Sequence, residues 1–378
     1  MGKPKIRFKG YEDDWEQRKL GGILKERTER AHGDEELLSV TIGNGVIRQI
    51  DSDKRNIASE DKSNYKVVKK GDIPYNSMRM WQGAVGNSEY DGIVSPAYTV
   101  LTPTSDANGK FFMELFKKES TLQIFQRWSQ GLTSDTWNLK YPVLSSIQFD
   151  IPSVEEQTEI ARYFSILDSL ITLHQRKCEE TKSLKKYMLQ KMFPENGNCV
   201  PKIRFSGFAD AWEQRKLGEV AQEFKSGNSL KADEIDITGD YPVYGGNGLR
   251  GYTSTYNHDG EYALIGRQGA LCGNMNYSVG KAYFTEHAVV VKADENNDTR
   301  FLYYMLDTMN LGQYSDQSAQ PGLAVNKLVK LENQFPMKEE QQRIGWYFSN
   351  IDHLITLHQH KCDELQKLKK FMLQNMFV

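Results

Sequence analysis

The chain has 378 residues, of which 39% are hydrophobic and 26% charged, so it holds enough apolar material for two or three domains with buried cores. Its formal net charge of −2 excludes attraction of a polyanion by overall charge, so any such binding must use local patches. No apolar run approaches the roughly 18 residues of a membrane span, and the N-terminus lacks a secretory signal. We therefore expect a cytoplasmic protein with no membrane partner.

The opening segment of the chain occurs twice in the sequence. Residues 4–21 align with residues 201–218, and both contain the heptapeptide WEQRKLG. We expect Trp15 and Trp212 to anchor these arms by packing, in equivalent places beside the far end of the other copy's long helix. The basic residues of the arms are expected to face a partner or phosphate, and they are Arg18, Lys19, Arg215 and Lys216.

A divergent middle follows each arm, and each middle predicts short strands followed by a helix. The strand-like runs are 37–42, 64–68, 91–101, 240–244, 261–266 and 282–292. The helix of the first middle is expected at 109–128, broken near Ser120, and that of the second at 299–310.

Three glycine-punctuated loops, at 76–92, 244–252 and 265–274, carry side chains of the kind that read DNA bases. Glycine permits close backbone approach, and Arg, Asn and Gln make bidentate contacts to base edges. For any one loop the alternative is an ordinary turn whose aromatic residue caps a core. The predicted DNA contacts are Ser77, Arg79, Trp81, Gln82, Asn87, Ser88, Tyr90, Tyr244, Gly245, Gly246, Asn247, Arg250, Tyr252, Arg267, Gln268 and Lys281.

A long ending closes each copy, and residues 151–193 align with residues 335–377. Apolar or small residues recur at alternating steps of four and three, which predicts two helices with coiled-coil seams. The seams are Ile160, Phe164, Leu167, Ile171, His174, Cys178 and Thr181, and Ile344, Phe348, Ile351, Ile355, His358, Cys362 and Leu365. The residues leave parallel and antiparallel pairing open.

Both seams contain a His and a Cys four residues apart. If the helices crossed there, His174, Cys178, His358 and Cys362 would make a zinc site, but a polar layer that fixes register is the alternative. The remaining cysteines form no C-x-x-C pair. Asp168 and Asp352 are expected to be N-cap-like or surface residues rather than catalysts.

Sequence motifs of catalysis are missing. There is no G-x-x-x-x-G-K-[ST], G-x-S-x-G or H-E-x-x-H, and no Pro-Pro dipeptide of the kind found in amino-methyltransferase motifs. A nuclease built on scattered carboxylates stays open.

We call the repeated arms and the repeated long endings the frame of each copy. The two frames and the two middles together resemble the specificity subunit of Type I restriction-modification enzymes. The resemblance rests on PKIRFKGYEDDWEQRKLG, GDIPYNSMRM, DGIVSPAYTVL, IGRQGALCGN, KAYFTEHAVVV and the two P-x-x-x-EQ helices with ITLHQ. It implies an α+β chain of two homologous mixed α/β target-recognition domains and two long helices forming an antiparallel coiled coil, with pseudo-two-fold symmetry. The expected parts are recognition domain 1 at 1–150, spacer helix 1 at 151–194, recognition domain 2 at 195–334 and spacer helix 2 at 335–378.

The resemblance also implies a function and partners. Each recognition domain would read one half of a bipartite, asymmetric site in double-stranded DNA, while the helices set the spacer. The partners would be two methyltransferase subunits and ATP-dependent restriction subunits. S-adenosylmethionine, ATP and Mg would be bound by those partners, and this chain would be non-catalytic with no cofactor or metal of its own.

Two other classes remain as alternatives. One is a self-contained DNA nuclease or methyltransferase with duplicated domains, and the other is a coiled-coil adaptor with no role on DNA.

Overall fold

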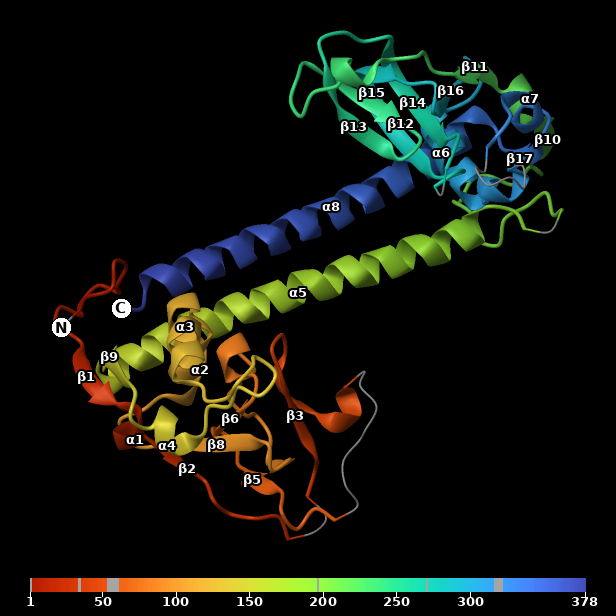
Figure 1. Ribbon diagram of the computed structural model, residues 1–378. Coiled ribbons are helices and arrows are strands. Elements are labelled where there is room, and N and C mark those ends of the chain that lie inside the picture. Colours follow the sequence, from red (N-terminus) through yellow and green to blue (C-terminus); the bar gives the residue numbers. More distant parts are fainter. Residues whose placement is uncertain (1, 33–34, 53–60, 196, 270, 316–321) are drawn as a thin grey trace. The chain divides into compact units, whose positions relative to one another are not determined.

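The structure is a computed structural model that describes residues 2–32, 35–52, 61–195, 197–269, 271–315 and 322–378. The described chain divides into two compact units (Figure 1). Unit 1 consists of residues 1–174 and 360–378, and unit 2 consists of residues 175–359. Each unit therefore contains one divergent middle and a part of both long helices.

Unit 1 begins with the first arm and contains the first middle. Its strands are β1 (Glu16–Lys19), β2 (Leu24–Glu26), β3 (Leu38–Thr41), β4 (Gly45–Arg48), β5 (Lys66–Val68), β6 (Ile73–Asn76), β7 (Gly92–Val94), β8 (Tyr98–Pro103) and β9 (Gln148–Ile151). Its helices are α1 (Leu20–Ile23), η1 (Gln49–Asp51), η2 (Met80–Gln82), α2 (Gly109–Lys117), α3 (Glu119–Trp128) and α4 (Tyr141–Leu144), followed by the start of α5 (Val154–Met192).

Unit 2 contains the second arm and the second middle. Its strands are β10 (Glu213–Lys216), β11 (Ala221–Ser226), β12 (Tyr241–Gly245), β13 (Gly248–Thr253), β14 (His258–Gly266), β15 (Met275–Phe284), β16 (Ala288–Ala293) and β17 (Glu332–Phe335). Its helices are η3 (Leu217–Glu219), η4 (Ala232–Glu234), α6 (Thr299–Thr308), η5 (Leu311–Tyr314) and α7 (Val325–Leu328), followed by the start of α8 (Lys338–Asn375).

The two middles build different sheets from similar strand patterns. In the described residues of unit 2, one six-stranded sheet has the order β11-β16-β14-β15-β12-β13. In the described residues of unit 1, the strands instead form a three-stranded sheet, β2-β8-β6, and the separate pairs β3-β4 and β5-β7. The runs expected at 91–101 and 282–292 are each two strands, because the chain turns at Ser95–Ala97 and at Thr285–His287.

The helix expected at 109–128 is broken as predicted, two residues before Ser120. Lys118 adopts an extended backbone conformation between α2 and α3. Asn108 and Asp298 are the N-caps of α2 and α6, and their side chains accept backbone N–H bonds from the first turn of each helix.

The seam positions of the long helices are buried or half-buried in both copies, as predicted. Within unit 1, Phe164 of α5 packs on Phe377 and Asp168 pairs with Lys369 of α8, so these segments run in opposite directions. Within unit 2, Lys185 of α5 pairs with Asp352 and Phe193 stacks on Phe348 of α8. The two segments of unit 2 are therefore antiparallel as well.

Each arm is fixed by its tryptophan. Trp15 lies edge-on to Phe111 of α2 and Phe377 after α8, and it is 1% exposed. The burial of an aromatic side chain of this size is a large contribution to the stability of unit 1.

Trp212 repeats this arrangement in unit 2. It lies edge-on to Phe193 after α5 and Phe301 of α6, and it is 3% exposed. Both arms therefore lie beside the far end of the other copy's long helix, as the repeat predicted.

Candidate nucleic-acid interface

Two of the predicted loops meet in unit 2 because glycines allow it. The β12–β13 hairpin turns at Gly246, where an added Cβ would lie 3.0 Å from the carbonyl oxygen of His287. Gly266, at the end of β14, contacts the carbonyl oxygen of Gly246 so closely that a side chain would not fit. Loops 244–252 and 265–268 are therefore neighbours, together with the turn from β15 to β16.

The backbone at the end of β14 is held on both sides. The N–H of Arg267 donates to the carbonyl oxygen of His287 at 2.9 Å, and the carbonyl oxygen of Arg267 accepts from Leu323 N–H at 2.9 Å. Gln268 forms an antiparallel bridge with Gly322. Side chains at 267 and 268 thus project from a fixed backbone, which base reading requires.

The predicted contacts of this region differ in exposure. Asn247, Arg250 and Gln268 are exposed, whereas Gly245 and Gly246 are buried and act by letting the loops approach. The guanidinium of Arg267 is half-buried and donates to the carbonyl oxygen of Glu286 at 3.4 Å.

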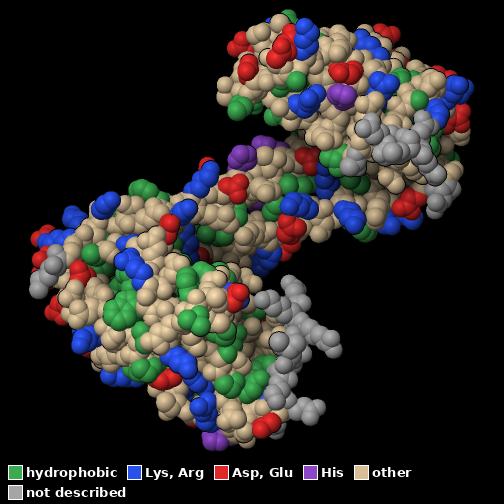
Figure 2. All heavy atoms as spheres, in the orientation of Figure 1, with side chains coloured by type: hydrophobic (Ala, Val, Ile, Leu, Met, Phe, Trp, Pro, Cys, Tyr) green, Lys and Arg blue, Asp and Glu red, His purple; other side chains and the backbone are tan. Residues whose placement is uncertain are grey.

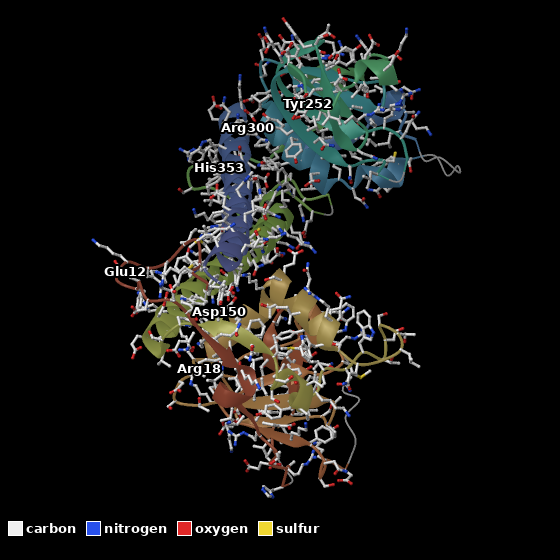
Figure 3. The ribbon with its side chains drawn as sticks, turned by 60° about the vertical axis from the view of Figure 1, so that its left-hand side comes forward. Glu12, Arg18, Asp150, Tyr252, Arg300 and His353 are labelled. Carbon is white, nitrogen blue, oxygen red and sulfur yellow. The ribbon has the colours of Figure 1, made fainter. Side chains whose placement is uncertain are left out.

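The aromatic and lysine candidates of unit 2 lie on the strands. Tyr244 packs edge-on against Phe284 at 6.0 Å, so part of its ring serves the core. Tyr252, labelled in Figure 3, lies on β13, and its backbone is paired to that of Asp236. Lys281 is exposed on β15, and its ammonium lies 4.7 Å from the ring centroid of Tyr256.

The candidates of unit 1 separate into two groups, because residues 84–88 run back along β6. Asn76 N–H donates to Ala84 O, and Ser88 N–H donates to Asp72 O at the opposite end of the strand. At one end, Arg79 is exposed and donates to Gln82 Oε1 at 3.5 Å. Ser77 lies beside them but is 5% exposed, and its hydroxyl is bonded to Thr99.

In the second group of unit 1, most of the candidate side chains form hydrogen bonds within the domain. Asn87 Nδ2 donates to Gly71 O at 2.8 Å, and the Ser88 hydroxyl donates to Tyr90 O at 2.7 Å. Ser88 is 1% exposed, so both predicted serines support their loops from inside the domain. Tyr90 is exposed, with the guanidinium of Arg48 at 5.8 Å from its ring centroid.

Sequence reasoning missed three neighbours of these loops. His287 and Glu286 lie against Arg267 and Gln268, in the turn that was expected to be strand. Trp137 packs edge-on to Trp81 at 5.2 Å. The polar triplet Thr285–His287 interrupts two strong strand patterns, and this interruption could have revealed the turn that contains Glu286 and His287.

Arginine–glutamate pairs tie each arm to the start of a long helix. Arg7 binds Glu156 at 2.6 and 2.7 Å, and Arg204 binds Glu340 at the same two distances. Hydrogen bonding to the buried carboxylate raises the pKa of both arginines. The acidic residue of P-x-x-x-EQ is thus the buried partner of the arm.

Asp168 and Asp352 are not N-caps, because both lie inside the long helices; they are partly exposed residues, as expected, and each is engaged in an ion pair. Asp168 accepts from Lys369 Nζ at 2.7 Å, while Asp352 accepts from Lys185 Nζ and from the Tyr304 hydroxyl, each at 2.7 Å. Both aspartates were placed by their helix position alone, which did not reveal the facing lysine.

Arg18 and Asp150 mark the joint of the first arm (Figure 3). They lie on β1 and β9, which pair antiparallel with Gln17 opposite Asp150. Arg18 is bound to Asp106 at 3.0 Å, so this basic residue of the arm is already part of an ion pair.

The charged side chains are mixed in sign on the face seen in Figure 2, where Lys and Arg lie among Asp and Glu. Among the described residues, no three His, Cys, Asp or Glu side chains come together to hold a metal ion. Within the same residues, no helix combines the length and apolar character of a membrane span.

The chain belongs to the family described as the Type I restriction modification DNA specificity domain, which it matches over residues 12–183 and 209–367. The match covers the second half of each arm, both middles and most of both long helices.

Among curated proteins, the chain is similar to the Type I restriction enzyme EcoprrI specificity subunit of Escherichia coli, at 43% identity over 146 residues. That match covers 38% of this chain and 36% of the relative. A putative type I specificity subunit of Haemophilus influenzae is 28% identical, with 35% of each protein covered, so the chain spans about a third of the length of these two relatives. The MjaVIII specificity subunit of Methanocaldococcus jannaschii is 23% identical over 80% of this chain and 77% of its own.

Two solved structures share the fold. A Type I restriction-modification system S subunit from M. genitalium has a TM-score of 0.70 at 17% identity, covering 100% of this chain and 99% of its own. A chain from a study of complex assembly and conformational transition of the type I R-M system has a TM-score of 0.50 at 17% identity, covering 96% and 97%. At these identities the likeness concerns the fold alone.

Proposed function

We propose that this chain is the DNA-recognition subunit of a Type I restriction-modification complex. Each middle reads one half of a bipartite, asymmetric site in double-stranded DNA. One observation carries the proposal: the tryptophan and arginine contacts of the arms are repeated in both units around two middles with different sheets. A constant frame around unlike domains suits two readers of different half-sites.

The long helices are proposed to set the spacer between the half-sites. The antiparallel contacts within each unit support pairing of α5 and α8 as an antiparallel coiled coil with pseudo-two-fold symmetry. The proposed parts keep the boundaries 1–150, 151–194, 195–334 and 335–378.

Two methyltransferase subunits are proposed to dock on this frame. The repeats expose equivalent apolar side chains on both helices, which identical partner copies would recognise. These pairs are Leu170 and Leu354, Leu184 and Leu368, and Tyr187 and Phe371.

Catalysis is assigned to the partners. The ATP-dependent restriction subunits and the methyltransferase subunits carry ATP, Mg and S-adenosylmethionine, and this chain binds none of them directly. The self-contained nuclease or methyltransferase is less favoured, because the curated relatives are named specificity subunits.

The recognition role is tested by selecting bound sequences from a randomised double-stranded DNA pool with the full-length chain. We expect two separate half-sites with a fixed gap. Arg79→Ala and Arg250→Ala should each lower discrimination in one half-site by about 1 to 3 kcal/mol if the arginine contacts a base edge. A wild-type chain that selects no sequence, or that cuts or methylates DNA by itself, contradicts the proposal.

The spacer role is tested by inserting seven residues of helix after both Gln175 and Gln359, which preserves the seam. The helices lengthen by about 10 Å, equal to about three base pairs, so the gap should lengthen while both half-sites stay the same. The matched control inserts seven residues after exposed Ser134, in the loop after α3, and should leave the gap unchanged. An unchanged gap in the helix variant rules out the spacer role.

A further inference from the structure

The imidazole of His287 lies between two polar side chains of the candidate interface in unit 2. Its Nδ1 is 3.1 Å from Gln268 Oε1, and its Nε2 is 3.5 Å from Glu286 Oε1. The histidine side chain is 42% exposed, so this row of three residues reaches the surface.

The row stands on the fixed backbone at the end of β14. Arg267 N–H is bonded to the carbonyl of His287, so the main chain of the histidine and that of the residue before Gln268 are joined directly. Gly246 and Gly266 pack closely beside this junction. The fold therefore holds the backbones that carry Gln268 and His287 side by side.

The second oxygen of Glu286 is buried and has no hydrogen-bond partner in the described structure. The other oxygen, Oε1, faces His287 Nε2. On the opposite side of the ring, Gln268 Oε1 faces Nδ1, which donates to it in the tautomer that carries the proton on Nδ1. The histidine thereby decides which end of the amide turns inward.

A glutamine in this state presents a defined edge outward. Oε1 keeps one lone pair and Nε2 keeps both of its N–H donors, because only Oε1 is bonded to the histidine. An acceptor beside a donor at this spacing complements the N6 amino group and N7 of adenine in the major groove. A freely rotating amide would present the opposite order equally well.

We propose that His287 is a positioning residue that fixes the Gln268 amide so that the second recognition domain reads one adenine of its half-site. The inference rests on the proposed DNA-recognition function. It assigns to His287 a role in base choice that its sequence context did not indicate.

The test uses the full-length chain and duplexes that carry the selected site with every single base-pair change. Gln268→Ala should lower the preference for one A·T pair by about tenfold to a hundredfold. His287→Ala should lower the preference at the same pair by about fivefold or more, and the double variant should lose no more than Gln268→Ala alone. His287→Asn, which keeps an amide donor near the position of Nδ1, should retain most of the preference.

The control is Lys281→Ala, which should weaken binding to all sequences alike. Thermal unfolding of each variant shows whether the domain is intact. The proposal is overturned if folded His287→Ala keeps the full preference, if it alters the preference at a different base pair, or if the losses of the two alanine variants add in the double variant. A wild-type chain that selects no site would instead reject the underlying function.

Discussion

The two units use the same lysine position for different third partners. In unit 1, Lys369 lies between Asp168 of α5 and Glu114 of the domain helix α2. In unit 2, the equivalent Lys185 pairs with Asp352 of α8, and the domain helix α6 contributes Tyr304, which donates to the same aspartate. The pair between helices is constant, and the group from the domain varies.

This difference teaches where sequence variation is tolerated. Glu114 is 1% exposed, and burial raises its pKa, so unit 1 contains a carboxyl that depends on the lysine. Tyr304 needs no such compensation, because a neutral phenol satisfies Asp352 by donating one hydrogen bond. Equivalent frames can therefore carry domains with unlike electrostatic demands.

The largest expected effect tests whether the two tryptophans stabilise their units equally. Trp15→Ala and Trp212→Ala should each lower the free energy of unfolding of their own unit by about 4 kcal/mol, since a large buried aromatic is removed. Hydrogen exchange followed by mass spectrometry assigns the loss to a unit. Phe371→Ala, at an exposed aromatic position, is the control and should have little effect. Unequal losses for the two tryptophans would break the equivalence.

A slightly smaller loss is expected at the arginine–glutamate pairs. Arg7→Met and Arg204→Met each leave a glutamate that is 1% or less exposed without its cation, which costs about 3 kcal/mol of unfolding free energy. Replacing the glutamate by leucine in the same variant should recover part of that loss. If only one of the two units were destabilised in chemical denaturation, the arms would not be held alike.

Removal of the two equivalent lysines should destabilise the two units to different extents. Lys369→Met is expected to cost about 2 kcal/mol because Glu114 loses its cation, whereas Lys185→Met should cost less than about 1 kcal/mol because Tyr304 still binds the half-exposed Asp352. Denaturant unfolding at one pH measures both values. Equal losses would show that the third partner does not matter.

The first of these variants should also depend on pH. A carboxyl whose folded pKa is raised favours the folded state fully below its unfolded pKa of 4.5, and that contribution is lost as pH rises through the folded value. Without Lys369 the pKa of Glu114 should rise further, so the stability of Lys369→Met should fall with increasing pH. Adding Glu114→Gln should remove this slope, and a slope that persists would assign it to another group.

The smallest effect is expected at Lys281. It is exposed, so Lys281→Ala should change the unfolding free energy by no more than about 0.5 kcal/mol. DNA affinity should weaken uniformly, with the slope of log affinity against log salt reduced by about 1 if the lysine binds phosphate. A change in sequence preference would place Lys281 at a base instead.

The repeat and its periodicity predicted the frame well. The repeat predicted the packing of Trp15 and Trp212, and the spacing of apolar residues predicted the seams. The strand-like runs overlap fewer than half of the described strands, and they miss among others β6, β11 and β13. The same reasoning could not find Glu114, since a glutamate on a helix surface is normally solvated. Its burial depends on Lys369, which is 255 residues away in the chain.

The candidate interface was predicted less completely. Glycine-rich patterns identified the loops that meet near Gly246, but not the turn at His287 that completes them. In unit 1 the same pattern included Ser77 and Ser88, whose hydroxyls are bonded inside the domain. A loop's composition predicts that it lies at a surface, but not which of its side chains point outward.

The glutamine at the start of each long helix binds mostly the main chain, although Gln341 Nε2 also donates to Asn297 Oδ1 at 2.9 Å. Gln157 Oε1 accepts from Asn108 N–H, and Gln341 Oε1 accepts from Asp298 N–H, while each amide nitrogen donates to the carbonyl of the proline five residues earlier. Contacts to main-chain atoms depend on the position of the backbone, and they restrict the type of the contacted residues little. Over evolutionary time, a domain can then accumulate substitutions on its reading surface without loosening its attachment to the helix.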